Sequence, residues 1–554
     1  MAISNKVTVG DYLIERIQAA GARHVFGVPG DFIISWMSRV EKSSLQLITT
    51  SDEQGAGFAA DSYARLKGLG VVAVTYGAGG LKLANSTAQA YAEESPVIII
   101  SGAPGIRERH LHALIHHMVK SYDSQLNVFK ELTCAQTSID DPNTACSEID
   151  RVINHALESK RPVYIELPRD MESIEVERPN FSSAPSLVPL LQSNVEALDE
   201  AFNEVLAILN QAKRPVVMLG IQATRFGLVD QVLQFIERHN IAVATTILSK
   251  SAINEMHPNF IGVYAGHMSR EEVFKYVENS DGLLMLGVLM TDINMGVYTA
   301  QLDPSKIIHV TRDRIAIGRH VYENISAPIF IERLSKSNLV GTKEKHYAPL
   351  LNYSPPSLGG DSEKITVETL FARLGQFITE ECVVVADPGD ALFAAIDLKM
   401  HHSSHFLASA FYASLGFAVP GSIGVGFADP SLRPIVVVGD GAFQMTGMEL
   451  SVAVRYGLDP IVIVLNNDGY LTERLILEGQ YNDLTPWKYH KITEVLGAGY
   501  GAVILSNGDF MREMSAAVQR RGSFTLLEVK LDRMDCSPAL KRLGAAINQQ
   551  VEKK

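Results

Sequence analysis

The sequence is poor in cysteine and in long apolar runs, and each shortage excludes a class of protein. Its 554 residues hold four cysteines without the paired spacing of a metal or redox motif (Cys134, Cys146, Cys382 and Cys536). We expect these thiols to stay reduced and to serve mainly in packing. No apolar run reaches the length of a membrane-spanning helix, and the first residues lack the apolar segment of a secretion signal. We therefore expect a cytoplasmic protein without a membrane partner.

Positive charge is also scarce. The chain has 49 Lys and Arg against 62 Asp and Glu, a formal net charge of −13. This excess of negative charge repels the phosphate backbone of nucleic acids, so we expect no nucleic-acid partner. A small anionic ligand is compatible with this balance because binding sites are local. The hydrophobic fraction of 46% is that of an ordinary globular protein, and the length suffices for three or four domains.

Apolar runs typical of buried strands alternate with helical patterns along most of the chain. This alternation predicts an α/β fold of three doubly wound, parallel-sheet domains. We expect the domains at residues 1–185, 193–340 and 364–554. Stretches rich in Pro and Ser, from about 172 to 192 and from 341 to 363, are typical of linkers. The middle domain has no catalytic constellation, so we expect its role to be structural.

Two predicted strands are followed by side chains suited to ligand binding. The strand at Ile435–Val438 ends at Gly439-Asp440-Gly441, and the strand at Ile461–Leu465 ends at Asn466-Asn467. Open α/β sheets bind ligands at the carboxyl ends of their strands, which is where Asp440 and Asn467 lie. Between the two strands a helical pattern runs through Met445, Met448, Leu450 and Val454.

The oxygen atoms of Asp440 and of the Asn467 amide are hard ligands of the kind that Mg²⁺ prefers. Gly441 and Ala442 leave backbone N–H groups open to a phosphate at the start of the helix. We interpret this stretch as a clamp for Mg²⁺ and a diphosphate. Alternatively, Gly-Asp-Gly is an ordinary strand-to-helix turn and Asn-Asn an ordinary loop. The spacing of the two motifs in this strand context favours the clamp.

The first domain repeats the arrangement without the metal ligand. Gly77-Ala78-Gly79 leads through a helical pattern to the strand pattern Pro96–Ile100, at nearly the spacing found after Gly439-Asp440-Gly441. We interpret this likeness as a duplication, and the alternative is turn chemistry common to two α/β units. Ala78 stands where the later copy has Asp440.

The motifs Gly439-Asp440-Gly441 and Asn466-Asn467 resemble the signature of thiamine-diphosphate enzymes. The resemblance implies that Mg²⁺ is bound by the side chains of Asp440 and Asn467 and by the backbone carbonyl of Gly469. It also implies that thiamine diphosphate contacts other residues of the same stretch, namely Gly441, Ala442 and Tyr470. The similarity spans the whole chain, and it implies the three-domain fold of the decarboxylases of this family.

Glu53 matches the glutamate that, in this family, hydrogen-bonds the aminopyrimidine ring of the cofactor and favours its imino form. The alternative is a first-turn glutamate that complements the helix dipole of the segment that follows. The resemblance further implies that the cofactor bends over Leu415 and that the Ala413 carbonyl accepts from its amino group. It places Asp390 near the diphosphate. Leu415 would also suit ordinary core packing.

Four residues match the branch of the family that decarboxylates pyruvate and indolepyruvate: Asp31, His116, His117 and Glu473. The match implies an acid/base cluster that serves non-oxidative decarboxylation of a 2-keto acid to an aldehyde and CO₂, with Glu473 mainly contacting the substrate carboxylate. Each has an ordinary alternative: an exposed histidine pair, a helix N-cap for Asp31 and a solvated helix residue for Glu473. The alternative functions are a thiamine-diphosphate-dependent carboligase of the acetohydroxyacid synthase or lyase type, and a degenerate protein that binds the cofactor without catalysis.

The chain departs from the family pattern close to these residues. Gly80 and Lys82 stand where relatives usually have Glu and Ser, and Leu392 stands where many have an aromatic residue. We expect Leu392, Thr472 and Ile476 to line an enlarged pocket for a branched or longer 2-keto acid. The resemblance also implies a homodimer, or a homotetramer formed as a dimer of dimers, in which two chains share each site.

Overall fold

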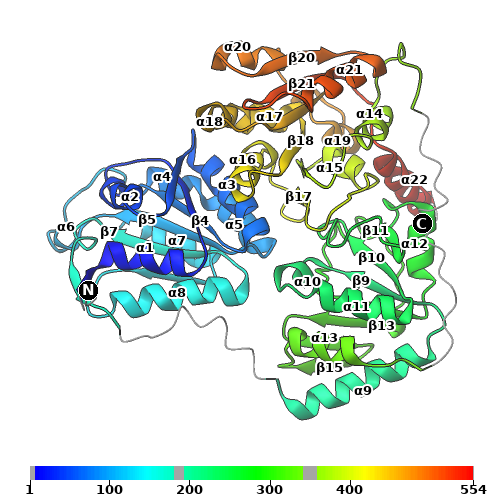
Figure 1. The fold of residues 1–554 in the computed structure, drawn as a ribbon, viewed down its shortest axis with the longest axis horizontal. Coiled ribbons are helices and arrows are strands. Elements are labelled where there is room, and N and C mark those ends of the chain that lie inside the picture. Colours follow the sequence, from blue (N-terminus) through cyan, green and yellow to red (C-terminus); the bar gives the residue numbers. More distant parts are fainter. Residues whose placement is uncertain (1–5, 180–192, 341–357, 553–554) are drawn as a thin grey trace.

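The computed structural model describes residues 6–179, 193–340 and 358–552, which form three α/β lobes, each built on one main sheet (Figure 1). The amino-terminal lobe, drawn in blue and cyan, lies beside the stacked central (green) and carboxyl-terminal (yellow to red) lobes. The sheets are mostly parallel and flanked by helices, which confirms the predicted fold class.

The amino-terminal sheet has six parallel strands in the order β3-β2-β4-β5-β7-β6. All residues of β4 and β5 are buried, as expected for strands covered on both faces. The strands are β2 (His24–Gly27), β3 (Gln46–Thr49), β4 (Gly70–Val74), β5 (Val97–Ala103), β6 (Ala135–Ser138) and β7 (Val163–Pro168). The helices are α1 (Val9–Ala19), α2 (Ile34–Glu41), α3 (Glu53–Lys67), α4 (Ala78–Lys82), α5 (Ala84–Ala92), α6 (Ile106–His110), α7 (Ser124–Leu132) and α8 (Ala145–Ser159).

The carboxyl-terminal sheet also has six parallel strands, in the order β17-β16-β18-β19-β21-β20. The strands are β16 (Cys382–Ala386), β17 (Phe406–Ala408), β18 (Arg433–Gly439), β19 (Ile461–Asn466), β20 (Tyr500–Ile504) and β21 (Thr525–Lys530). The helices are α14 (Val367–Leu374), α15 (Asp390–Ala395), α16 (Ala418–Ala428), α17 (Asp440–Thr446), α18 (Leu450–Tyr456), α19 (Leu471–Ile476), α20 (Ile492–Leu496), α21 (Asn507–Ala517) and α22 (Pro538–Glu552).

The two terminal sheets share one topology. Numbered along the chain within each sheet, both run in the order 2-1-3-4-6-5. The Gly77-Ala78-Gly79 turn follows β4 and the Gly439-Asp440-Gly441 turn follows β18, and each of these is the third strand of its sheet. This correspondence supports the interpretation of the two lobes as copies of one unit.

The central sheet is parallel except at one edge. Its order is β11-β10-β9-β12-β13-β14-β15, and β14 and β15 are antiparallel to their neighbours. The strands are β9 (Pro215–Leu219), β10 (Ala242–Thr246), β11 (Phe260–Tyr264), β12 (Gly282–Leu286), β13 (Ile307–Thr311), β14 (Arg314–Ile317) and β15 (His320–Glu323). The helices are α9 (Val195–Gln211), α10 (Ile221–Arg225), α11 (Val229–His239), α12 (Glu271–Glu278) and α13 (Ala327–Lys336).

The first linker begins later than the predicted position of about residue 172. β8 (Glu175–Glu177) pairs antiparallel with β1 (Lys6–Thr8), and its central residue, Val176, is buried. The alternating Glu-Val-Glu pattern is that of a half-buried strand, and it precedes the Pro/Ser-rich residues. The rest of this linker, 180–192, and most of the second, 341–357, lie outside the described residues.

The helix predicted after Asp440 is interrupted. α17 ends at Thr446, one turn of 3₁₀ helix spans Gly447–Glu449, and α18 begins at Leu450. Met445 and Met448 are exposed rather than buried. Glycine is a poor helix former, and the Thr446 hydroxyl donates to the carbonyl of Gly416 on another segment, so the chain bends at this point.

A buried charge joins the two terminal lobes where α3 packs against α16. The Arg65 guanidinium forms a bidentate ion pair with Asp61 at 2.8–2.9 Å and a second pair with Glu93 at 2.8 Å. It also donates to the Ala408 carbonyl and lies over the Phe417 ring of the other lobe. The lobes are therefore held together by a fully paired cation rather than by apolar contact alone.

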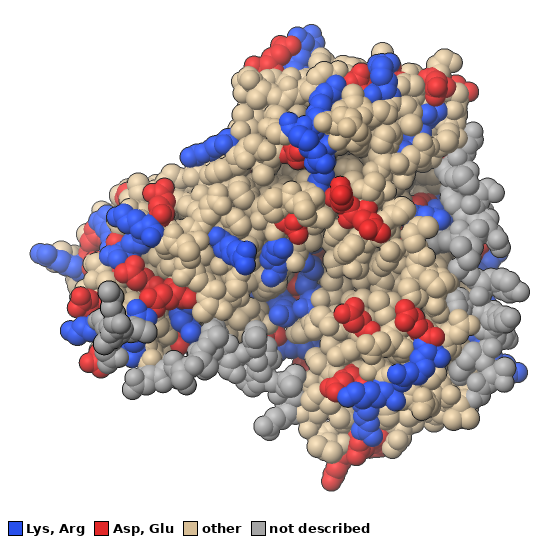
Figure 2. All heavy atoms as spheres, in the orientation of Figure 1, with Lys and Arg blue, Asp and Glu red and all other residues tan. Residues whose placement is uncertain are grey.

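The outer surface carries charge of both signs. On the face in Figure 2, Lys and Arg side chains lie interspersed with Asp and Glu, and no side of this face is dominated by one sign. Among the helices of the described ranges, none combines the length and apolar character that crossing a membrane requires.

Candidate active site

The predicted clamp lies at the carboxyl ends of β18 and β19. Asp440 is the first residue of α17, and its carboxylate accepts from the N–H groups of Gly441 (2.8 Å) and Gly469 (3.1 Å). Burial raises the pKa of Asp440 to about 6. Asn467 follows β19, and its buried Oδ1 atom has no hydrogen-bond partner. A buried carboxylate beside an unsatisfied amide oxygen fits the donor set of a hard divalent cation.

The loop after β19 is held by a residue that the sequence did not single out. The buried guanidinium of Arg474, on α19, donates to the carbonyls of Asn467 (3.0 Å) and Asp468 (2.6 Å) and pairs with Asp483 (3.0 Å). These bonds fix the turn that carries Asn467 and Gly469. An isolated arginine in a helical segment gives no sign of such long-range bonds, so sequence reasoning had no signal for it.

Glu53 is the first residue of α3, at the edge of the amino-terminal sheet. Its Oε1 atom points towards the turn after β4, because a Cβ on Gly79 would lie 3.2 Å from it. Its Oε2 atom lies 2.8 Å from Lys82 Nζ, and the same ammonium also contacts Asp52. Lys82 is one of the positions at which the sequence departs from the family pattern that it resembles.

Asp31, His116 and His117 come together at the same edge. Asp31 Oδ2 lies 2.8 Å from His116 Nε2, and the His117 ring lies next to the His116 ring. Helix α2 begins at Ile34 without a side-chain cap, which excludes the N-cap alternative for Asp31. His117 has a left-handed backbone (φ +67°), and it packs on Gly77, where a Cβ would lie 2.2 Å from the His117 carbonyl oxygen.

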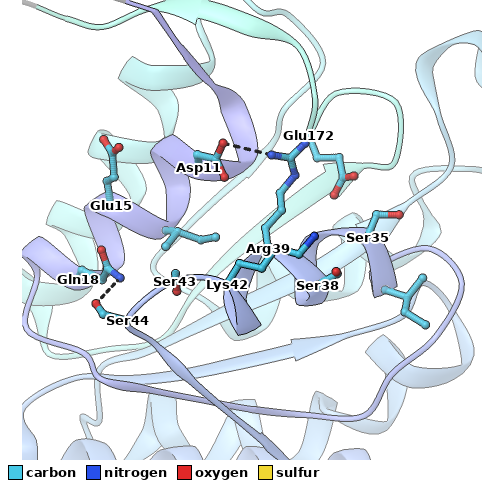
Figure 3. A pocket seen from close by; sticks show the side chains of 12 residues that line it. Asp11, Glu15, Gln18, Ser35, Ser38, Arg39, Lys42, Ser43, Ser44 and Glu172 are labelled. Carbon is cyan, nitrogen blue, oxygen red and sulfur yellow. Dashed lines mark hydrogen bonds and ion pairs between the residues drawn. The ribbon is translucent and has the colours of Figure 1, made fainter. Parts of the chain in front are cut away.

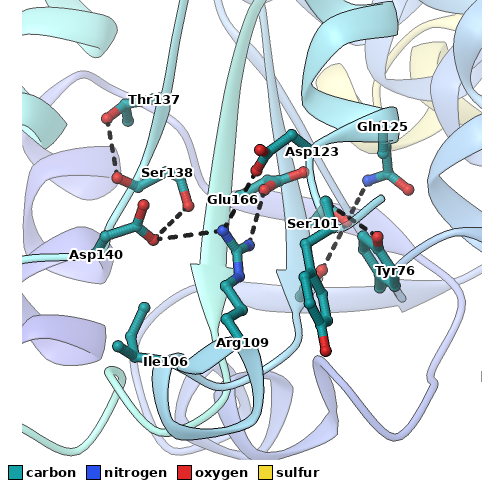
Figure 4. A network of polar contacts seen from close by, with 12 residues as sticks. Tyr76, Ser101, Ile106, Arg109, Asp123, Gln125, Thr137, Ser138, Asp140 and Glu166 are labelled. Carbon is teal, nitrogen blue, oxygen red and sulfur yellow. Dashed lines mark hydrogen bonds and ion pairs between the residues drawn. The ribbon is translucent and has the colours of Figure 1, made fainter. Parts of the chain in front are cut away.

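The loop that carries the histidine pair is anchored at both ends, and Figure 4 shows the polar contacts of Arg109 that contribute to this. Arg109, before the loop, reaches Glu166 of β7 at 3.2 Å and also approaches Asp123, after the loop, at 3.8 Å. The Tyr76 hydroxyl donates to the Tyr122 carbonyl at 3.0 Å. Burial raises the pKa of Glu166 to about 7. This network fixes the loop to the sheet, and only the structure reveals it because its members are scattered along the chain.

The predicted cofactor-bending segment lies on the opposite lobe. Ala413 is exposed with a left-handed backbone (φ +59°), and Leu415 is half-buried against the apolar cluster of this lobe. The buried Asp387 carboxylate accepts from the N–H groups of Gly416 (2.8 Å) and Ala418 (2.7 Å). Burial raises the pKa of Asp387 to about 7. Asp387 therefore fixes the end of this turn, a role that the sequence did not indicate.

The predicted residues near the diphosphate and in the substrate pocket are more scattered. Asp390 accepts from Ser537 N at 2.9 Å through one oxygen, and its other oxygen is buried without a partner. Leu392 is buried on α15, and Thr472 Oγ1 would lie 3.5 Å from a Cβ on Gly389. Further along α19, Glu473 and Ile476 are exposed. Their assignment to a pocket stays a prediction.

Within one chain the predicted site is in two halves. Asp31, Glu53 and the histidines belong to the amino-terminal lobe, while Asp440, Asn467 and Glu473 belong to the carboxyl-terminal lobe. Among the described residues, no hydrogen bond or ion pair joins the two sets. Both halves are flanked by exposed apolar side chains: Leu111, Leu114 and Val119 on one, and Met445, Ile476 and Leu477 on the other.

A hollow of about 850 Å³ lies away from these residues, between α1 and α2 (Figure 3). Some of the charged and polar side chains that line it are paired with each other: Arg39 forms an ion pair with Asp11 at 3.1 Å, and Gln18 donates a hydrogen bond to Ser44 at 2.8 Å. Glu15 and Glu172 add further negative charge to the same walls. None of the predicted site residues lines it, so it contributes nothing to the candidate site.

Known proteins resemble this chain over almost its whole length. Residues 7–127, 202–331 and 387–529 match the N-terminal TPP binding, central and C-terminal TPP binding domains of thiamine pyrophosphate enzymes. Indole-3-pyruvate decarboxylase of Azospirillum brasilense is 35% identical, over 96% of this chain and 97% of that protein. Pyruvate decarboxylase of Hanseniaspora uvarum is 32% identical (98% and 99%), and alpha-keto-acid decarboxylase of Mycobacterium ulcerans is 30% identical (98% and 96%).

The contact between Gly77 and His117 gives a test of how the histidine loop is held. In Gly77→Ala, the new Cβ collides with the His117 carbonyl, so we expect the loop to lose its order. Hydrogen–deuterium exchange of peptides covering residues 111–123 should become faster than in the parent protein.

Gly68→Ala is the matched control. Gly68 also has a left-handed backbone (φ +87°), but its Cβ would meet nothing within 4 Å. Gly68→Ala therefore carries a conformational cost of about 1–2 kcal/mol for its left-handed backbone without any collision, and exchange in the histidine loop should not change. Equal exchange in the two variants would mean that Gly77 does not hold His117 in place.

Proposed function

This chain belongs to the thiamine-diphosphate-dependent 2-keto acid decarboxylases, and from that premise we propose that it converts a branched or longer-chain 2-keto acid to an aldehyde and CO₂, with Mg²⁺ as its metal. The observation that carries the proposal is the bonded pair of Asp31 and His116, with His117 beside it, at the same sheet edge as Glu53. This combination supplies the acid/base groups that decarboxylation to an aldehyde requires.

Each residue has a distinct part in the proposed reaction. When bound, thiamine diphosphate supplies the nucleophilic carbon and the electron sink for the loss of CO₂. Glu53 would hydrogen-bond the pyrimidine ring through its Oε1 atom, because the ion pair with Lys82 uses Oε2. Asp31 and His116 move protons at the substrate oxygen and at the product carbon, and His117 assists them. Glu473 would lie against the substrate carboxylate.

Mg²⁺ is assigned to the clamp in the carboxyl-terminal lobe. Asp440, the unsatisfied Oδ1 of Asn467 and the Gly469 carbonyl would hold it through oxygen atoms, and the N–H groups of Gly441 and Ala442 would face the diphosphate. Ala413, Leu415 and Tyr470 would contact the rest of the cofactor, and Asp390 would lie near the diphosphate.

Removal of the metal should release the cofactor. We expect a chelator to abolish CO₂ release and added Mg²⁺ to restore it, because Asp440 and Asn467 would hold the metal and the metal would supply the positive charge that the diphosphate needs. Asn467→Ala should raise the Mg²⁺ concentration for half-maximal activity by about tenfold or more.

The neighbouring Asn466 provides the control for this metal experiment. Its amide donates to Glu528 at 2.8 Å, so Asn466→Ala removes a buried hydrogen bond without removing a proposed ligand. It should lower thermal stability while the Mg²⁺ requirement stays as in the parent. A shift in Mg²⁺ requirement as large as that of Asn467→Ala would argue against the clamp.

We assign the complete site to two chains, with the amino-terminal half of one facing the carboxyl-terminal half of the other. The separation of the halves within one chain and the exposed apolar side chains around each half support this arrangement. A symmetric dimer would cover both apolar surfaces at once. A tetramer would follow by pairing of dimers.

Mixing two inactive variants tests the shared site and the roles of its residues together. Glu53→Gln damages the amino-terminal half and Asp440→Ala damages the carboxyl-terminal half, so each variant alone should release almost no CO₂. In a mixed dimer one site receives both lesions and the other receives neither. Random co-assembly should therefore restore about a quarter of the parent's activity.

If each chain held its own complete site, mixed dimers would contain no intact site and activity would stay near zero. Differently tagged chains, co-expressed and purified through both tags, give the mixed dimers directly, and their sites should then be about half intact. Full activity of Glu53→Gln on its own would show that the assignment of Glu53 is wrong.

The substrate preference rests on Leu392 and Thr472, whose side chains are small for positions near the predicted substrate. We expect higher kcat/KM for 2-ketoisovalerate, 2-ketoisocaproate or phenylpyruvate than for pyruvate. Overlap is expected, because one methylene in such a pocket is worth only ~1–3 kcal/mol. A clear preference for pyruvate would contradict the enlarged pocket, and a 2-hydroxy ketone in place of free aldehyde would indicate a carboligase.

A further inference from the structure

Three side chains that could bind a metal ion come together: Asp31, His116 and His117. No other such group occurs within residues 6–179, 193–340 and 358–552. One ligand atom of each lies within 4.8 Å of those of the other two. None of the three belongs to the oxygen-rich clamp at Asp440 and Asn467. The chain therefore presents a second set of ligands with different chemistry.

Two imidazole nitrogens and one carboxylate oxygen are the ligands that first-row transition metals use in open, three-ligand sites. Nitrogen and oxygen ligands at about 2.0–2.1 Å from a tetrahedral Zn²⁺ stand roughly 3.3 Å apart. Asp31 Oδ2 and His116 Nε2 are already 2.8 Å apart, so these two need only to separate slightly. A ring nitrogen of His117 lies within 4.8 Å of both of these atoms, so a short movement of the ring would make it the third ligand.

The surroundings hold the ligands close together while leaving them open to solution. His117 is fixed through its backbone, because its carbonyl and Cβ pack on Gly77. The Phe32 ring lies 5.0 Å from the His116 ring and 6.2 Å from the His117 ring, which limits the rotation of both. The side chains of Asp31 and His116 are 48% and 58% exposed within a single chain, so no other part of that chain keeps an ion from them.

We propose that Asp31, His116 and His117 bind a divalent first-row transition metal such as Zn²⁺, and that this binding reversibly inhibits the enzyme. Coordination occupies the lone pairs of the imidazoles and of the carboxylate, so these groups can no longer exchange protons with the substrate. The inhibition rests on the proposed function, in which the same side chains move protons. The binding does not depend on it.

Binding is measured on the protein without turnover. Zn²⁺ is titrated against a chromophoric chelator, with Mg²⁺ and thiamine diphosphate in excess so that the oxygen-rich clamp is satisfied. We expect one Zn²⁺ per chain, and we expect His117→Ala or His116→Ala to weaken binding at least about tenfold. The visible absorption of bound Co²⁺, used as a second probe, should report nitrogen and oxygen ligands and no thiolate.

The chain offers matched controls for this titration. His110 is an exposed histidine a few residues before the pair, outside the cluster, so His110→Ala should leave both Zn²⁺ binding and basal activity unchanged. Cys134→Ser removes the one cysteine that is not buried and should also leave Zn²⁺ binding unchanged. Zn²⁺ binding that persists in both His116→Ala and His117→Ala would overturn the proposal.

The activity measurement separates this proposal from the proposed function. Zn²⁺ should lower kcat in the presence of saturating Mg²⁺, and a chelator followed by fresh Mg²⁺ should restore it. Absence of Zn²⁺ binding overturns the metal site and leaves the decarboxylase assignment intact. Zn²⁺ bound at this cluster without inhibition overturns the inhibitory part, and the proton-transfer roles of the three residues fall with it.

Discussion

The structure depends on how it satisfies one buried cation, Arg65. A guanidinium removed from water is costly unless its charge and its donors are matched, and here Asp61, Glu93 and the Ala408 carbonyl match them. Two of these partners belong to the amino-terminal lobe and the third to the carboxyl-terminal lobe. The second oxygen of Glu93 accepts from the backbone N–H groups of Phe411 and Tyr412, in the turn that leads to Ala413 and Leu415. The ion pairs thus fix how the lobes meet and, through that, the shape of the turn.

The shared topology of the two terminal sheets explains why each carries half of the predicted chemistry. In the carboxyl-terminal sheet, Asp440 and Asn467 follow the third and fourth strands. In the amino-terminal sheet, Asp31, Glu53 and the histidine loop follow the first, second and fourth strands. Both sets therefore lie at the carboxyl ends of parallel strands, where such sheets bind ligands. The carboxyl-terminal copy keeps the aspartate and asparagine that suit a metal and a diphosphate. The amino-terminal copy has Ala78 in place of the aspartate and instead presents Glu53 and the Asp31–histidine cluster. In the proposed function, one scaffold would therefore serve two different parts of the reaction.

The sequence predicted buried strands where they are continuous apolar runs, as at Ile435–Val438 and Ile461–Leu465. It missed β3, β6 and β20, which are short or lie at sheet edges and have a mixed pattern. It singled out Asp440, Asn467 and Glu53 as candidates because their motifs are local. Arg474 and the Arg109–Glu166 pair escaped notice because their partners are distant in sequence, and no local pattern encodes such contacts. The prediction of one continuous helix after Asp440 was wrong. The spacing of apolar residues carries no information about the hydrogen bond that the Thr446 hydroxyl donates to another segment.

The packing of α3 on α16 has a consequence for synthesis. The two helices touch along small residues, and Ser62 of α3 donates to the Gly421 carbonyl, yet about 350 residues separate them in the chain. At 5–20 residues per second, a ribosome takes roughly 20–70 s to make that stretch after α3 has emerged. During this interval Arg65 and the apolar face around it have no partner from the other lobe. A nascent chain therefore has a long aggregation-prone period, and factors that shield α3 while translation proceeds should affect the yield of folded protein more than factors that act on the finished chain.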